Sequence, residues 1–65
     1  MEPYQQRVVA EREELDTRRV ALAKFIGSEA FAAVAPEEQG RLREQLALMG
    51  QYSRVLGERI EAFES

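Results

Sequence analysis

The chain has 65 residues, no cysteine, no histidine, and a formal net charge of −3 from nine basic and twelve acidic residues. A single domain of this length, residues 1–65, buries only ~60% of its unfolded surface, so it needs a further source of stability. Disulfides are excluded, and a zinc or iron site built from carboxylates alone is unfavourable. We therefore expect no metal and no cofactor, and we expect the chain to form a homo-oligomer.

The acidic balance argues against binding to long nucleic acid, because such proteins normally carry a basic excess. No apolar run approaches the ~20 residues of a membrane span, and the N-terminus lacks the pattern of a signal peptide. These features predict a cytoplasmic protein with no membrane partner. Nucleophilic catalysis is also disfavoured, since the sequence offers neither a histidine base nor a glycine-rich phosphate loop.

The first predicted helix covers residues 3–26. Pro3 suits its first position, and Gly27 is a candidate for its C-cap. An apolar stripe follows the helical period, but Glu11 and either Arg18 or Arg19 interrupt it where apolar residues are expected. The stripe consists of Tyr4, Val8, Leu15, Leu22 and Ile26.

Residues 28–35 are predicted to form a short helical elbow. Ser28 is a plausible N-cap, and Phe31 and Val34 would fold back over the end of the hairpin. An elbow of this length most naturally returns the next helix antiparallel to the first.

The second long helix is predicted over residues 36–64, with Pro36 at its first position. Its main apolar stripe consists of Leu42, Leu46, Met49, Tyr52, Leu56, Ile60 and Phe63. Leu48 and Val55 lie off that stripe and form a second, shorter one, so this helix needs more than one neighbour. The predicted fold is an all-α antiparallel helical hairpin with a short helical elbow, assembling into a homo-oligomer.

Gly50 and Gly57 lie seven residues apart on one face of this helix, where a glycine costs about 1 kcal/mol relative to alanine. Two explanations fit: close packing of another helix, which we favour, or room for a ligand ring or phosphate against the backbone. We therefore assign Leu48, Val55, Gly50 and Gly57 to the oligomer interface.

Basic residues also gather on the first helix, where Arg7 and Arg18 share a face and Arg19 adjoins it. An i,i+4 ion pair between Glu11 and Arg7 is the simpler explanation from the sequence alone. The alternative is an anion clamp, because guanidinium groups bind phosphates and a tyrosine ring such as that of Tyr4 stacks on a base.

Three segments follow one another in the sequence: YQQRVVAEREELDTR, LAKFIGSEAF and EQGRLREQLALMGQYSRVLGERI. In this order and spacing they resemble a family of small bacteriophage proteins, the anti-CBASS and anti-Thoeris nucleotide sponges, from Tyr4 to Phe63. The resemblance implies a homo-oligomer, commonly a hexamer, that captures cyclic dinucleotides, cyclic trinucleotides or cyclic ADP-ribose isomers without cleaving them. The chain is shorter than the well-known members and lacks their extra segments.

The resemblance also implies a pocket shared between subunits, with an aromatic residue early in helix one and a basic residue further along it. Tyr4 matches the aromatic residue, and Arg18 or Arg19 matches the basic one, where the family often has lysine. In the second long helix, Arg54 and Arg59 are candidates for a separate trinucleotide site.

We therefore predict a phage protein that sequesters a cyclic nucleotide second messenger in the host cytoplasm, as a hexamer or dimer. One alternative is a small helical protein–protein interaction module with no nucleotide ligand, which would bind its partner through Leu48, Val55 and their neighbours. The other alternative is an enzyme that degrades the messenger, although the sequence shows no catalytic group for it.

Overall fold

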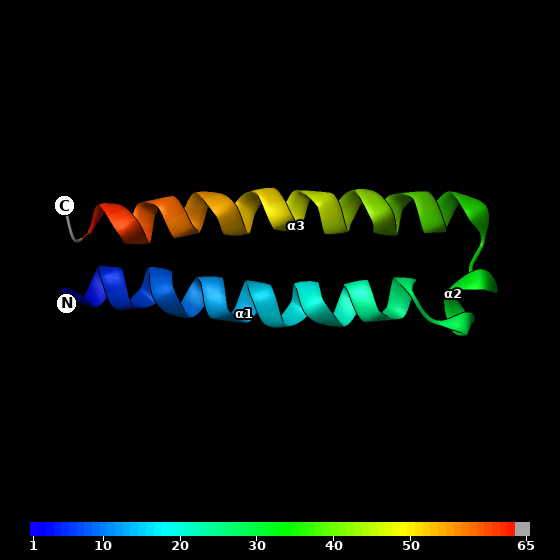
Figure 1. The fold of residues 1–65 in the computed structure, drawn as a ribbon, viewed down its shortest axis with the longest axis horizontal. Helices are drawn as coiled ribbons and strands as arrows, with labels where there is room; N and C mark the ends of the chain where they lie inside the picture. The colour runs from blue at the N-terminus through cyan, green and yellow to red at the C-terminus, as the bar shows by residue number, and fades with distance from the viewer. Residues whose placement is uncertain (64–65) are drawn as a thin grey trace.

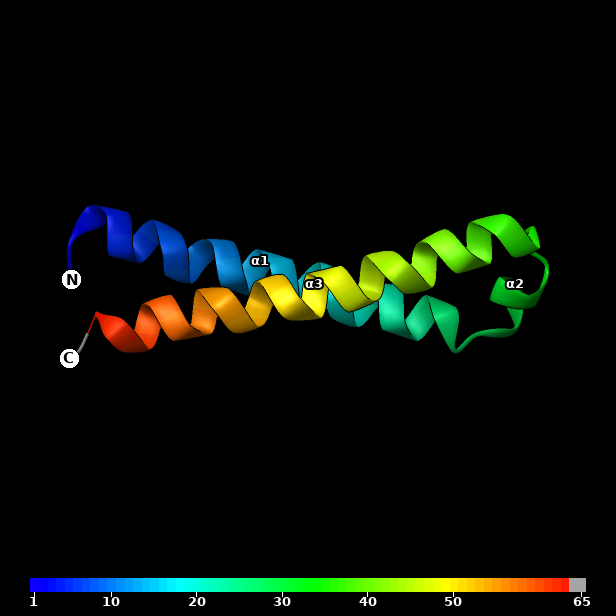
Figure 2. The ribbon, with the colours of Figure 1, turned by 90° about the horizontal axis from the view of Figure 1, so that it is seen from above.

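A computed structural model describes residues 1–63 of the chain. It contains α1 (Pro3–Ile26), a short α2 (Glu29–Ala32) and α3 (Pro36–Ala62). The two long helices run antiparallel, so that the start of α1 and the end of α3 lie together, with α2 at the opposite end (Figure 1). Figure 2 shows that α1 and α3 cross along their length. The predicted all-α hairpin with a helical elbow is confirmed, as an elongated body of 46 × 14 × 14 Å.

Both long helices begin with proline, as predicted, because the first helical N–H has no partner within the helix and its loss costs nothing. Gly27 follows α1 as its C-cap and donates its N–H to the Ala23 carbonyl at 3.1 Å. α3 ends at Ala62, and the predicted end at residue 64 lies outside the described residues.

α2 closes one end of the hairpin through Phe31. The Phe31 side chain is buried, with its ring edge-on to Phe25 at 5.9 Å between centroids and the Arg43 guanidinium 5.0 Å from its centroid. Gln39 of α3 donates from Nε2 to the carbonyls of Phe31 at 3.0 Å and Val34 at 2.8 Å. The predicted plug is confirmed for Phe31, whereas Val34 is only half-buried.

Ser28 precedes α2 at the N-cap position, but its side chain makes a different hydrogen bond from the one expected. Its Oγ donates to the Phe25 carbonyl at 2.6 Å and makes no capping bond to α2. The expected side-chain cap is therefore wrong, because the same hydroxyl instead satisfies a carbonyl in the last turn of α1.

The core between α1 and α3 is thin. Within residues 1–63 the buried apolar side chains are Val8, Phe31 and Leu56, and only Leu56 has no exposed surface at all. The remaining residues of the predicted inward stripe on α3, and Phe63 just after it, are half-buried: Leu42, Leu46, Met49, Ile60 and Phe63. Such a core gives little hydrophobic stabilisation for a chain of this length.

Tyr52 departs from its predicted place in the inward stripe. Its side chain is 46% exposed, while the neighbouring Ser53 is 4% exposed. Ser53 takes the inward position because its hydroxyl donates to Asp16 of α1 at 2.6 Å. A polar contact between the helices thus replaces an apolar one at this level.

The charged residues on the inward face of α1 are Arg12, Asp16 and Arg19, which are all half-buried, while Glu11 and Arg18 are exposed. The predicted interruption at Glu11 is therefore wrong, because Arg12, four residues after Val8, occupies that turn of the buried face. At the second interruption, where two arginines were possible, Arg19 is the one that turns inward.

Leu48, Tyr52 and Val55 form an exposed apolar stripe on α3, which we call the outer stripe. Their spacing of four and three residues places them on one face of the helix. Their exposed fractions are 57%, 46% and 41%, so no other part of residues 1–63 covers them. The need of α3 for a second neighbour is therefore not met within a single chain.

Candidate functional site

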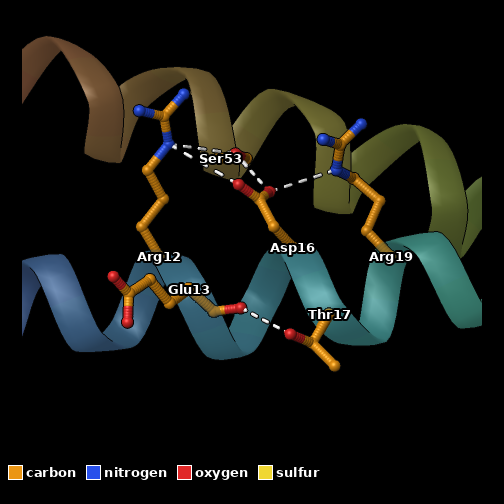
Figure 3. A network of polar contacts seen from close by, with 6 residues as sticks. All are labelled: Arg12, Glu13, Asp16, Thr17, Arg19 and Ser53. Atoms are coloured by element: carbon orange, nitrogen blue, oxygen red, sulfur yellow. Dashed lines mark hydrogen bonds and ion pairs between the residues drawn. The ribbon is translucent and has the colours of Figure 1, made fainter.

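Asp16 is the centre of a polar cluster between α1 and α3, made of Arg12, Asp16, Arg19 and Ser53 and called here the Asp16 cluster (Figure 3). Ser53 donates from Oγ to Asp16 Oδ1 at 2.6 Å, and Arg19 donates from Nε to the same oxygen at 3.2 Å. Arg12 donates from Nε to Ser53 Oγ at 3.3 Å, and this nitrogen lies 3.9 Å from Asp16 Oδ2. The cluster therefore joins the two long helices near the middle of α1.

The surroundings of Asp16 stabilise its ionised form. The hydrogen bond from Ser53 contributes most to lowering the pKa of Asp16 below its ordinary value. Desolvation opposes it, and Arg19 and then Arg12 lower the pKa further. The Ser53 hydroxyl acts both as a donor, to Asp16, and as an acceptor, from Arg12. Both arginines thus lie beside a carboxylate that is charged at neutral pH.

An open groove of about 350 Å³ lies beside the cluster, and we call it the arginine groove. It is lined by Arg12, Arg19, Gly50, Ser53, Arg54, Gly57, Glu58 and Glu61. Arg54 and Glu58 form an ion pair on the α3 side. The groove combines three guanidinium groups and two glycines with the carboxylates of Glu58 and Glu61, and its guanidinium groups can bind a flat or anionic ligand.

The two glycines of the groove have different surroundings. A Cβ atom at Gly57 would lie 2.8 Å from Cζ and Nη2 of Arg12 and 2.9 Å from Nη1, which is too close. A Cβ atom at Gly50 would meet nothing within 4 Å. Gly57 therefore lets Arg12 of the same chain lie against α3, while Gly50 faces open space. The role of both glycines in an oligomer interface stays a prediction.

The residues predicted to bind ligand do not form a single site. Arg19 and Arg54 line the arginine groove. Arg18 lines a separate open hollow of about 530 Å³ on another face, together with Ala10, Glu13, Glu14 and Thr17. Arg7 and Arg59 are exposed and line neither hollow. The predicted ion pair between Arg7 and Glu11 is not formed within the described residues.

Tyr4 lies at the open end of the hairpin, away from the predicted cations. Its ring is 51% exposed and lies edge-on to Phe63, with 5.8 Å between the centroids. Arg19 follows fifteen residues later on α1, which is about 22 Å along a helix rising 1.5 Å per residue. One chain therefore does not bring Tyr4 and Arg19 to the same ligand.

Arg12 and Asp16 were not among the residues predicted to form a site. The signal that would have found them is periodicity among charged residues: Arg12, Asp16 and Arg19 have the four-then-three spacing of a helical face. Within residues 1–63 no group of acidic side chains is placed to hold a metal ion. In the same range neither long helix has an apolar stretch of the length that a membrane span requires.

A family model covers nearly the whole of the chain. The family model described as Sequestin matches residues 2–62, a range that includes all three helices and the whole Asp16 cluster. No curated protein and no solved structure matches the chain.

Proposed function

The chain belongs to the Sequestin family, the phage sponges for cyclic nucleotides that counter CBASS and Thoeris immunity, and on this basis we propose that it captures a cyclic nucleotide second messenger without cleaving it. The ligand classes are cyclic dinucleotides, cyclic trinucleotides and cyclic ADP-ribose isomers. The match over residues 2–62 is the observation that carries the proposal. The protein acts in the cytoplasm of the infected host and must be abundant relative to the signal, because capture follows mass action.

The proposed site is formed between chains of a homo-oligomer, a hexamer or a dimer. A cyclic dinucleotide carries two phosphates and two flat bases, so its receptor needs cations and stacking surfaces facing each other. Tyr4 and Arg19 are too far apart on one helix to meet this need. Two hairpins brought together by a symmetry axis place Tyr4 of one chain against Arg18 or Arg19 of the other. Arg7 extends this site, and Arg54 and Arg59 form a second one for trinucleotides.

Calorimetric titration with a panel of cyclic dinucleotides, cyclic trinucleotides and cyclic ADP-ribose isomers tests the function. At least one ligand is expected to bind, and Tyr4→Ala or the double variant Arg18→Ala/Arg19→Ala should weaken it by at least about tenfold, since charge-assisted contacts contribute ~1.5–3 kcal/mol each. Arg41→Ala removes a cation that is paired with Glu38 instead, and it should bind like the parent. If no member of the panel binds, the proposed function is wrong.

Capture and cleavage are separated by recovering the ligand. After incubation, the protein is denatured by heat and the released nucleotide is analysed by chromatography. A sponge returns the ligand intact, whereas a degrading enzyme returns its products.

The outer stripe favours a second function, that of a helical protein–protein interaction module. Leu48, Tyr52 and Val55 are exposed on one face of α3, as in helices that bind through an apolar surface. An oligomer that assembles normally but binds no member of the nucleotide panel would support this function over capture of a messenger.

A further inference from the structure

The geometry of the Asp16 cluster points to a phosphate site: we propose that Arg12 and Arg19 bind the phosphate of a nucleotide in the arginine groove, and that Asp16 and Ser53 position both guanidinium groups for it. The identity of the ligand as a cyclic nucleotide rests on the proposed function. The site itself is argued from a single hairpin and adds Arg12, Asp16 and Ser53 to the residues considered so far.

The cluster holds the two arginines in the same way. They lie seven residues apart on α1 with Asp16 between them, and both make their hydrogen bonds to the cluster through Nε. The two guanidinium groups extend from α1 alongside α3, beyond these contacts (Figure 3). Terminal nitrogens that do not take part in the cluster's hydrogen bonds can donate to the oxygens of a phosphate, which arginine binds by two parallel bonds.

The local balance of charge at the cluster favours an anion. Asp16 carries one negative charge and lies beside two positive ones, so the cluster has an excess of one positive charge. On α3, Arg54 and Glu58 neutralise each other. Glu61 also lines the groove, eleven residues beyond Gly50 on α3. Glu61 is four residues after Gly57, so the phosphate is expected between the guanidinium groups of Arg12 and Arg19, on the side of Arg12 away from Glu61.

Two glycines of α3 leave space beside the arginines. Arg12 lies so close to Gly57 that any side chain there would displace it. Gly50 has open space where a side chain would be, and it lies in the same groove as Arg19. α3 thus has glycine at two interior positions, and each lowers helix stability by about 1 kcal/mol relative to alanine. One of these positions makes room for the arginine and the other leaves room for a ligand.

A purely structural role for the cluster makes different predictions. If Arg12 and Arg19 only join α1 to α3, their substitution changes stability and leaves anion binding unaltered. If they bind phosphate, an added anion perturbs their own Nε–H groups in the unaltered protein.

The first experiment uses inorganic pyrophosphate as the probe and NMR spectroscopy of arginine Nε–H signals as the readout. Pyrophosphate should shift the signals of Arg12 and Arg19 more than that of Arg41, which lies outside the groove. Arg12→Lys, which keeps the charge but loses the planar fork, should weaken binding by about tenfold or less, and Arg12→Gln by more than that. Arg41→Gln removes the same charge elsewhere and should have no effect.

The positioning role of Asp16 is tested with two variants that change the net charge equally. Asp16→Asn and Glu13→Gln each remove one negative charge, which by itself attracts an anion more strongly. If Asp16 positions the arginines, Asp16→Asn should weaken pyrophosphate binding severalfold despite the added attraction, while Glu13→Gln should leave it unchanged or tighten it slightly. Tighter binding in both variants would contradict the positioning role.

The outcomes separate this inference from the proposed function. If a cyclic nucleotide binds and neither pyrophosphate nor that nucleotide perturbs Arg12 and Arg19, the phosphate lies elsewhere and the inference is overturned. If pyrophosphate perturbs both arginines and no cyclic nucleotide binds, the anion site stands and the proposed function fails. Circular dichroism of each variant confirms that it remains helical, and the measurement on the unaltered protein needs no variant at all.

Discussion

The three glycines of α3 have different neighbours, and this decides what a methyl group would do at each. None of the described glycines has a positive φ, so alanine fits the backbone at all of them. A Cβ atom at Gly40 would meet nothing within 4 Å, whereas one at Gly57 would meet the Arg12 guanidinium at 2.8 Å. The effect of alanine is therefore expected to differ between positions that have the same intrinsic helix preference.

Gly40→Ala should raise the free energy of unfolding by roughly 0.5–1 kcal/mol, which is the difference in helix preference. Gly57→Ala should gain less or nothing, because Arg12 must move and its hydrogen bond to Ser53, typically about 1 kcal/mol, is lost. Urea unfolding at one protein concentration measures both variants. Equal gains at the two positions would show that Arg12 does not lie against Gly57 in solution.

Asp16 should make stability depend on pH below neutrality. Its pKa is lowered in the folded protein by Ser53, Arg19 and Arg12, so the unfolded chain takes up a proton at a higher pH than the folded one. The stabilisation is fully present above the unfolded pKa of about 3.9 and is lost as the pH falls through the folded pKa. The difference in unfolding free energy between the parent and Asp16→Asn, measured by urea titration from pH 7 to 2.5, should shrink toward the acid end. A constant difference would mean that Asp16 has no altered pKa.

Arg12 and Ser53 illustrate what the sequence could and could not show at this scale. Apolar periodicity identified most inward positions of α3 and the interruption of the α1 stripe. It wrongly placed Tyr52 and Glu11 on the inward faces of the helices. A stripe of apolar residues contains no information on which polar side chains form hydrogen bonds between the helices. The hydrogen bond between Ser53 and Asp16 links residues 37 apart in the chain, and nothing local encodes it.

At the scale of elements, the sequence predicted the bounds of the helices well. Prolines at the first helical positions and Gly27 at the end of α1 are strong local signals, and both long helices begin where they indicated. The prediction that Phe31 closes the end of the hairpin is confirmed. The role of Gln39 was not predicted, because its hydrogen bonds to the Phe31 and Val34 carbonyls form only once the chain has turned back. A hydrogen bond from the side chain of a following helix cannot be predicted from the periodicity of the sequence.

The outer stripe on α3 is exposed in a single hairpin, and we predict that it mediates self-association. Leu48→Glu or Val55→Glu should weaken self-association by at least about tenfold, because each would place an unpaired charge in an apolar contact. Ala47→Glu adds the same charge at an exposed position of α3 that is not three or four residues from any member of the stripe, so it serves as the control. Sedimentation velocity of the three variants over a range of concentrations measures the effect. Similar association in all of them would exclude the outer stripe from the interface.

At the scale of the whole molecule, the thin core and the uncovered stripe have one common consequence. The described chain buries three apolar side chains and leaves seven large ones exposed, of which three form the outer stripe. A hairpin of this size gains little stability from its own core, and we expect the additional apolar burial to come from another chain. Folding and assembly are therefore expected to be coupled.

Coupled folding and assembly make the melting temperature depend on protein concentration. Tenfold dilution should lower the midpoint of thermal unfolding, followed by circular dichroism, since dissociation precedes or accompanies unfolding. Val55→Glu should show a lower midpoint and a weaker dependence, because less of its stability comes from association. A midpoint that stays constant over a hundredfold range, together with a folded 7.4 kDa species in light scattering, would mean that the hairpin is stable alone. In that case the site shared between chains loses its basis, and the Arg12–Arg19 groove, which needs only one chain, would be the remaining place for a nucleotide phosphate.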